Sequence, residues 1–191
     1  MVFSSPIFLF LFLPLVLVVY FISPKSFKNI ILLIASLLFY AWGEPVYIGL
    51  MLISIVFNYF WALGLGKSLG KTKKRKKSAL IFLIIGVAIN LGLLFYFKYA
   101  VFAIAVLNKA TIHLNISPII LSDIHLPVGI SFFTFHTISY LVDIYRRLFK
   151  PQKNLFTLAL YVSFFPQLIA GPIIRYHTIA AQLEKRQVTF D

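Results

Sequence analysis

Six apolar stretches, each close to the length of a membrane span, constrain this chain more than any other feature. They fall near 6–22, 27–42, 46–66, 79–98, 126–145 and 155–174. A bilayer core about 30 Å thick needs roughly 20 helical residues to cross it, and irregular backbone cannot face lipid. The pattern predicts an all-α integral membrane protein, a multi-span helical bundle in the lipid bilayer, with a single transmembrane domain over residues 1–191.

The composition supports the same class of protein. Hydrophobic residues make up 61% of the chain and charged residues 12%, with a mean hydropathy of +0.95. A soluble domain is closer to half apolar and a quarter charged. The chain contains no cysteine, which excludes disulfides, thiolate metal ligands and cysteine nucleophiles.

The basic residues are distributed unevenly. The net charge is +13, and seven of the eighteen lysines and arginines lie in "KSLGKTKKRKK", residues 67–77. Because apolar stretches flank this run, it is typical of a cytoplasmic loop that obeys the positive-inside rule and not of a nucleic-acid patch. Alternation of the spans then places Lys25, Lys28 and the basic residues of 146–153 inside, and Lys109 outside. We predict an external N-terminus and no nucleic-acid partner.

The last apolar stretch does not fit a simple crossing. A full crossing would place the basic residues that follow it outside the cell, against the positive-inside rule. Its end, "FFPQLIAGPIIRY" (164–176), contains Pro166 and Gly171-Pro172. Proline removes a backbone donor and disfavours helix for the residue before it. We predict a re-entrant segment that bends, lines a cavity and returns to the cytoplasmic side; the alternative is a kinked span.

The stretch "LPVGISFFTFHTISYLVDIYRR" (126–147) holds polar residues within an apolar span. If its helix starts at Pro127, His136 lies about 15 Å along the axis, near the middle of the bilayer. An ionisable group at that depth is a functional candidate by default. The alternative is a neutral imidazole whose nitrogens are satisfied by Ser139, Tyr140 or a neighbouring helix.

The helical repeat of this stretch gathers its polar residues on one side. At 100° per residue one stripe carries Gly129, His136, Tyr140 and Asp143. Asp143 has Arg146 and Arg147 at i+3 and i+4, the spacing of a helical ion pair, so we expect its charge to be compensated by them. Seven positions separate it from His136, which is too far for a direct hydrogen bond.

The other polar residues predict less chemistry. Asn58 and Asn90 lie in the middle of consecutive spans, and we expect them to form a hydrogen bond between helices. His113 and His125 on the external segment lack the spacing of metal ligands, so no metal site is predicted. We expect His177 at the cytoplasmic surface.

Three motifs carry a resemblance to a known family. They are P-x-G-x-S-F-x-T-F from Pro127, S-Y-x-x-D-x-Y-R from Ser139 and F-P-Q-x-x-A-G-P-I-x-R-Y from Phe165. Together with "LLIASLLFYAWGEPVYIGLMLISIVFNYF" (32–60), they resemble the membrane-bound O-acyltransferase family, in particular its bacterial alginate O-acetyltransferase branch. The likeness extends over essentially the whole chain.

The resemblance implies an enzyme of the bacterial inner (plasma) membrane. Such an enzyme takes an acyl group, here expected to be acetyl, from acetyl-CoA or an acyl carrier on the cytoplasmic side. It passes the group through a conduit to hydroxyls of an extracellular polysaccharide such as alginate, together with periplasmic or extracellular acetylation proteins. The donor is a substrate, and no bound cofactor is expected. From the residues alone, a transport or channel component and an inactive fragment stay open as alternatives.

The resemblance also implies site residues. The family's catalytic histidine lies well downstream, so we expect it beyond Asp191 and regard the chain as a truncated, N-terminal portion. His136 is a secondary catalytic candidate, because relatives often carry glutamine there. The expected conduit residues are Pro166, Gln167, Gly171, Pro172 and Arg175. Gly171-Pro172 would fix the bend, Gln167 would offer its amide to the passing acyl carrier, and Arg175 would meet an anionic donor at the cytoplasmic mouth.

Overall fold

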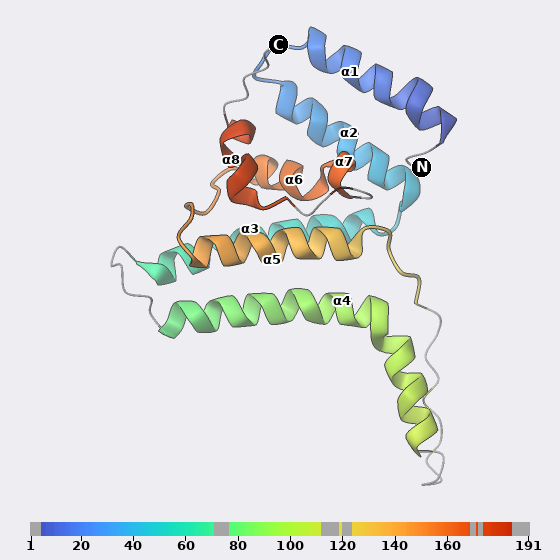
Figure 1. Cartoon of the computed structure of the whole chain (residues 1–191), viewed down its shortest axis with the longest axis vertical. Coiled ribbons are helices and arrows are strands. Elements are labelled where there is room, and N and C mark those ends of the chain that lie inside the picture. Colours follow the sequence, from blue (N-terminus) through green and yellow to red (C-terminus); the bar gives the residue numbers. More distant parts are fainter. Residues whose placement is uncertain are drawn as a thin grey trace.

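The protein is all-helical wherever its structure is described. The computed structural model describes residues 5–70, 77–111, 119, 124–168, 171 and 174–184. Its elements are η1 (Phe8–Phe12), α1 (Leu13–Ile22), α2 (Lys28–Gly43), α3 (Ile48–Leu69), α4 (Lys77–Thr111), α5 (Ile130–Tyr145), α6 (Leu155–Ser163), α7 (Phe165–Leu168) and α8 (Tyr176–Glu184) (Figure 1). Within these ranges there is no strand, and the predicted all-α class is confirmed.

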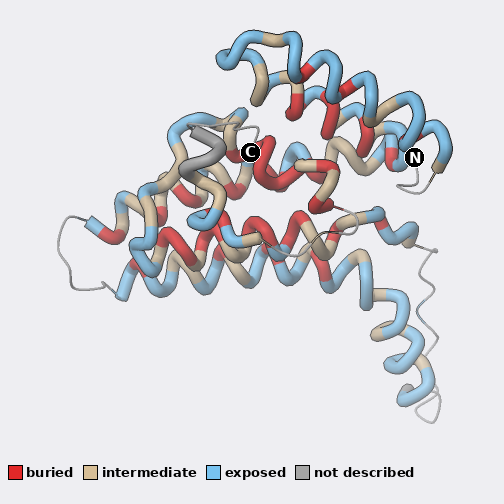
Figure 2. Tube along the Cα trace, turned by 45° about the horizontal axis from the view of Figure 1, so that its top comes forward, coloured by how far each residue is buried: buried red, intermediate tan, exposed pale blue. Residues whose placement is uncertain are grey.

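Helix α5 is at the centre of the arrangement. It packs against α3 and α4 on one side and against α6, α7 and α8 on the other. Helix α2 packs against α6 and α7, and α1 packs against α2 (Figure 1). The buried residues follow this order, since they concentrate on α5 and α6 and become sparse toward α1 (Figure 2).

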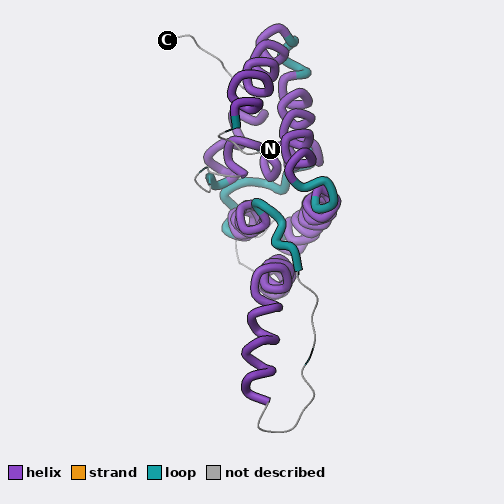
Figure 3. Tube along the Cα trace, turned by 90° about the vertical axis from the view of Figure 1, so that its right-hand side faces the viewer, coloured by secondary structure: helices purple, strands orange, loops and turns teal. Residues whose placement is uncertain are grey.

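The outer helices expose apolar surface. Helix α3 and residues Lys77–Ala110 of α4 are long and apolar enough to cross a membrane, and Phe8–Ile22 and Lys28–Gly43 are shorter apolar helices. The C-terminal part of α4 bends away from the bundle (Figures 1 and 3). Its Phe102 is 69% exposed, and Phe10 before α1 is 82% exposed. A soluble protein seldom exposes such continuous apolar faces, so this helical bundle fits a membrane protein.

An amide pair joins the long helices in their middle. The Asn58 amide on α3 donates to Asn90 Oδ1 on α4 at 3.0 Å, and the Asn90 amide donates back to Asn58 Oδ1 at 2.8 Å. The Thr137 hydroxyl on α5 also donates to Asn90 Oδ1 at 3.1 Å. All three residues are buried. The predicted contact between the two asparagines is confirmed and extends to a third helix.

Two close contacts bring α3 and α4 together near this pair. A side chain on Gly86 would collide with the Trp61 indole, so this glycine makes room for the ring. The Trp61 ring packs against Phe82 with centroids 4.6 Å apart, and its Nε1–H donates to the Phe82 carbonyl at 2.9 Å. The indole therefore has its hydrogen bond inside an apolar contact.

Helix α5 begins later than the sequence suggested. It starts at Ile130 and not at Pro127, because Gly129 adopts a left-handed conformation with φ of 77°. The Val128 N–H, which would belong to the first turn, instead donates to a Glu44 carboxylate oxygen at 3.1 Å. A side-chain acceptor from another element has replaced the expected first turn.

Candidate functional site

The predicted stripe of α5 faces α6, α7 and α8. A Cβ on Gly129 would lie 3.1 Å from the Leu168 carbonyl at the end of α7. About two turns further along the helix, the His136 ring packs on Tyr161 of α6, with ring centroids 5.2 Å apart. The Tyr140 ring packs on the first residue of α8, Tyr176, at 5.1 Å. The stripe is thus buried against the segment for which the sequence predicts a conduit.

Asp143 ends this stripe and has a histidine as its partner. His177 Nδ1 lies 2.9 Å from Asp143 Oδ2. The carboxylate side chain is 3% exposed and the imidazole 36%. A carboxylate at Nδ1 fixes the orientation and the tautomer of the ring. His177 thus lies at the surface, as expected, but it is joined to a buried carboxylate, which was not expected.

The expected ion pair between Asp143 and the following arginines is wrong. Helix α5 ends at Tyr145, and Arg146 at its C-cap still has helical backbone angles, but the ion pair that Asp143 forms among the described residues is with His177. Arg147 adopts φ of 61°, and the Arg147 and Leu148 N–H groups donate back to Ile144 and Asp143 carbonyls at 2.8 and 3.1 Å, the pattern of a Schellman motif. The Arg147 guanidinium donates to the Leu69 carbonyl at 2.8 Å instead.

A pocket of about 550 Å³ opens beside His177. It is lined by Phe149, Lys150, Pro151, Gln152, Lys153, Tyr176, His177 and Ala180. The Phe149 and Tyr176 rings form an aromatic wall with centroids 4.5 Å apart. The described lining residues include two lysines and a histidine and no carboxylate, which makes the pocket suitable for an anionic ligand that also carries an apolar part.

Three hydrogen bonds hold together the segments that form this pocket and the helices behind them. The Gln152 side-chain amide donates to the Tyr176 hydroxyl at 2.9 Å, and the Gln152 N–H donates to the Tyr140 hydroxyl at 2.9 Å. The Tyr161 hydroxyl donates to the Ile174 carbonyl at 2.9 Å. The loop before α6 and the start of α8 therefore lie together at the Asp143 end of α5.

His136 lies in the middle of the stripe without a polar partner. It is fully buried, and within the described ranges neither of its ring nitrogens has a hydrogen bond. The Tyr140 hydroxyl, one of the partners considered, accepts from Gln152 instead. The ring is held by packing on Tyr161, and no described residue accepts or donates a hydrogen bond at it as the orienting partner of a catalytic base would.

The broken segment holds the other predicted residues. Helix α6 ends at Ser163, and α7 spans only Phe165–Leu168. The Phe165 N–H, freed by the break, donates to the Ser36 hydroxyl of α2 at 3.3 Å. Pro166 lines a second, apolar pocket of about 280 Å³ between this link and α1. The backbone break near Pro166 is therefore satisfied by the neighbouring helix.

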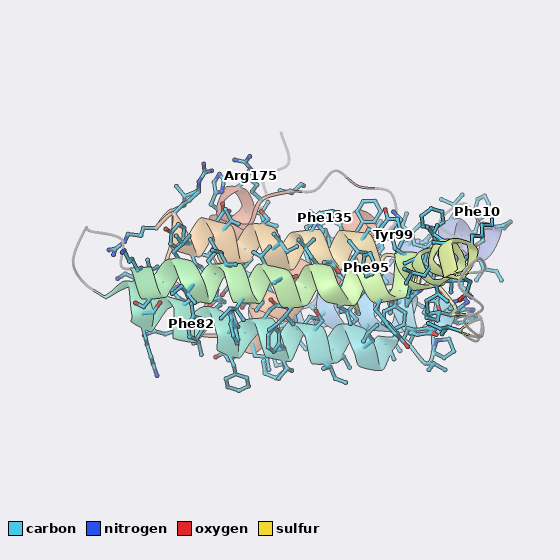
Figure 4. The ribbon with its side chains drawn as sticks, turned by 90° about the horizontal axis from the view of Figure 1, so that it is seen from below. Phe10, Phe82, Phe95, Tyr99, Phe135 and Arg175 are labelled. Atoms are coloured by element: carbon cyan, nitrogen blue, oxygen red, sulfur yellow. The ribbon has the colours of Figure 1, made fainter. Side chains whose placement is uncertain are left out.

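Of the remaining residues of that set, Gln167 and Gly171 lie together and Arg175 lies apart from them. Gln167 is 9% exposed, and its Oε1 has no partner among the described residues. Gly171 packs so closely on this turn that a Cβ would lie 2.7 Å from the Gln167 Cα. Arg175 is exposed and lies at the edge of the bundle (Figure 4). Pro172 lies outside the described residues, as does His113.

Sequence reasoning missed Glu44 at the opposite end of α5. His125 Nε2 lies 3.1 and 3.2 Å from the two Glu44 oxygens, and the Glu44 side chain is 8% exposed. The His125 ring also stacks on Tyr47 with centroids 5.3 Å apart. The chain has only five acidic residues, so an acid between two apolar stretches could have been recognised as one that needs a partner.

Comparison with known proteins identifies the relatives of this chain. No family profile and no solved structure matches it. A protein of Azotobacter vinelandii named "Probable alginate O-acetylase AlgI" is 42% identical over 191 residues, 100% of this chain and 38% of the relative. Its namesake in Pseudomonas syringae pv. tomato is 41% identical over 191 residues, 100% of this chain and 36% of the relative. The chain is homologous to the N-terminal part of these O-acetylases.

The likeness extends beyond alginate O-acetylases. A "Peptidoglycan O-acetyltransferase" of Helicobacter pylori is 35% identical over 221 residues, 97% of this chain and 39% of the relative. The resemblance to the membrane-bound O-acyltransferase family is confirmed by these matches. The chain spans less than two fifths of the length of the relatives named here.

Proposed function

We propose that this chain is the N-terminal portion of a membrane-bound O-acyltransferase that passes an acetyl group across the bacterial inner membrane to hydroxyls of an extracellular polysaccharide such as alginate. The observation that carries the proposal is the identity of about 40% over the whole chain to alginate O-acetylases. The proposal concerns the full-length protein, because the matched part is 36–38% of those relatives.

The proposed topology has six apolar segments, an external N-terminus and one transmembrane domain over 1–191. The sixth segment, 155–174, is re-entrant. Two contacts support this: Gln152, before α6, bonds to Tyr176, after α7, and His177 bonds to Asp143. Both contacts place the chain that follows α7 next to the Tyr145 end of α5, after which α6 begins. The lysine-rich loop assigns this end to the cytoplasm.

Within this topology the pocket beside His177 is the proposed entry for the donor, acetyl-CoA or an acyl carrier. Lys150 and Lys153 face its phosphate groups, and Arg175 meets it at the rim. Gly171-Pro172 fixes the bend behind the entry, Pro166 shapes the turn, and Gln167 offers its amide to the passing thioester. No metal or bound cofactor takes part.

The proposed catalytic histidine lies beyond Asp191, and His136 has a packing role. A base that removes the acceptor hydroxyl proton needs a nitrogen within hydrogen-bond reach of that hydroxyl. His136 is enclosed by side chains, which favours the assignment of catalysis to another residue. Periplasmic or extracellular acetylation proteins would receive or present the polymer.

Expression of the full-length gene in an alginate-producing strain that lacks its own O-acetylase tests the activity. We expect acetyl esters on the secreted alginate, measured by proton NMR before and after mild alkaline de-esterification. Alginate that stays free of acetyl esters, although the protein is found in the inner membrane, would refute the assigned acceptor.

Cysteine labelling in intact cells tests the topology separately. We expect Val46→Cys, which is 79% exposed in the turn after α2, to react with a membrane-impermeant maleimide. Arg175→Cys and Ser68→Cys should react only after permeabilisation. Reaction of Arg175→Cys in intact cells, with Ser68→Cys unreactive, would show that the sixth segment crosses the membrane.

A further inference from the structure

An apolar groove lies between α1 and the link from α6 to α7. Its volume is about 280 Å³. One wall is the face of α1 formed by Leu13, Val16, Leu17 and Tyr20. The other is Phe164, which links α6 to α7, with Phe165 and Pro166 at the start of α7, and Phe8 and Leu32 complete the lining. Leu17 is 45% exposed, so the groove opens sideways to the surroundings of the bundle.

The groove has the shape of an extended chain. The α1 residues that line it occupy positions i, i+3, i+4 and i+7, which form a stripe along the helix axis. At 1.5 Å per residue this stripe is about 10 Å long. If α1 stands in the bilayer, the groove runs in the direction of the lipid acyl chains and opens toward them.

The Lys28 ammonium group lies at the Tyr20 end of the groove. Lys28 Nζ lies 4.7 Å from the centroid of the Tyr20 ring and 5.8 Å from that of Phe21. Lys25 is exposed in the turn just before it. No acidic residue precedes Glu44 in the chain, and Glu44 lies at the other end of α2. Lys28 thus forms no ion pair with a carboxylate in the described part of the chain.

We infer that this groove binds an anionic phospholipid of the cytoplasmic leaflet, with one acyl chain along the α1 stripe and its phosphate against Lys28 and Lys25. Lysines near the membrane surface attract anionic headgroups by about 1 kcal/mol each, and the apolar walls bind the chain. Because the far wall is the α6–α7 link, the bound lipid braces the broken segment from outside. This inference does not depend on acyl transfer.

Lipid binding to the purified full-length protein tests the inference. Native mass spectrometry in detergent would measure the affinity for phosphatidylglycerol and, with matched acyl chains, for phosphatidylcholine. We expect phosphatidylglycerol to bind at least tenfold more tightly to the wild-type protein. Lys28→Ala should reduce this preference at least fivefold, whereas Lys28→Arg should retain it.

Lys98→Ala is the matched control. Lys98 Nζ also lies over a tyrosine ring, at 5.4 Å from the Tyr99 centroid, but on α4 and away from the groove. We expect its lipid preference to stay within twofold of wild type. Equal affinity of the wild type for both lipids, or equal effects of the two alanine variants, would overturn the proposed headgroup site.

A second variant tests the acyl-chain site. Val16→Trp fills the groove, and we expect it to lose tight binding of both lipids while its circular dichroism stays helical. If lipid binding is unchanged in this variant, the groove is not the site. If the variant unfolds at lower temperature and no lipid stabilises even the wild type, the groove is occupied by another part of the protein and the inference is wrong.

Discussion

The two ends of α5 are held in the same way and serve different purposes. Each end has a buried carboxylate that contacts a histidine from a distant part of the chain. At the Ile130 end of α5, which the proposed topology places outside and which is called the outer end, Glu44 accepts from His125 and also from the Val128 N–H. At the inner end, Asp143 contacts His177, which borders the cationic pocket.

The two ends differ in the exposure of the histidine and in what else the carboxylate binds. The His125 side chain is 61% exposed and the His177 side chain 36%. Because Glu44 also binds a backbone N–H that would otherwise be unpaired, its loss should damage the fold itself. Loss of Asp143 should release the His177 side chain at the pocket and leave most of the fold intact. The outer contact stabilises the bundle, and the inner contact connects the bundle to the proposed donor entry.

The chain that returns from α7 toward the inner end should be the most sensitive to a substitution. Gly171→Leu places a side chain within 2.7 Å of the Gln167 backbone, which cannot move away as a flexible side chain would. Overpacking of this kind costs about 1–3 kcal/mol, and we expect acetylation by the full-length protein to fall more than a hundredfold. Gly92→Leu, where a side chain meets nothing within 4 Å, should retain activity. Equal activity of the two variants would show that the bend does not matter.

At the outer end, Glu44→Ala should give the largest loss of stability. It leaves the Val128 N–H without its acceptor and removes the partner of His125, at a cost of about 1.5–3 kcal/mol. Unfolding in detergent, followed by circular dichroism, would measure this cost. His125→Ala should cost less, because Glu44 then still accepts from Val128. The reverse order would show that the histidine and not the backbone contact stabilises this end.

Asp143→Ala should separate stability from function. Because His177 is partly exposed, water can replace the lost hydrogen bond, and we expect a loss of about 0.5–1.5 kcal/mol. Acetylation should fall more strongly than in Glu44→Ala at equal amounts of folded protein, and Asp143→Asn should restore part of it. An activity loss that merely follows the amount of folded protein would contradict a role for this contact at the pocket.

What the sequence predicted correctly depended on regular helix. The contact between Asn58 and Asn90 followed from two amides in the middle of consecutive apolar helices, and the stripe of α5 followed from the helical repeat. Both inferences need only the geometry of an uninterrupted helix. The buried faces of the bundle were therefore open to prediction from the pattern of residues.

The predicted contacts are wrong or missing where a helix ends and a segment distant in the sequence supplies the partner. The Arg147 backbone adopts a left-handed conformation that the residue type does not indicate, and its guanidinium donates to the Leu69 carbonyl. His177 lies 34 residues after Asp143, and His125 lies 81 residues after Glu44. No local pattern reports such contacts. The sequence indicates only that a buried carboxylate requires a partner and not which residue supplies it.

Between the two ends, the substitution of His136 should have the smallest effect on acetylation. His136→Gln keeps a polar side chain of similar length and loses the ring contact with Tyr161. We expect a loss of about 1 kcal/mol in stability and acetylation within twofold of wild type. Thr137→Val, which removes the hydroxyl that donates to Asn90 at 3.1 Å, is a matched change on the other face of α5 and should cost about 0.6 kcal/mol. A hundredfold loss of acetylation in His136→Gln alone, with the protein folded, would contradict a packing role. It would show that His136, in the middle of α5, is the catalytic base.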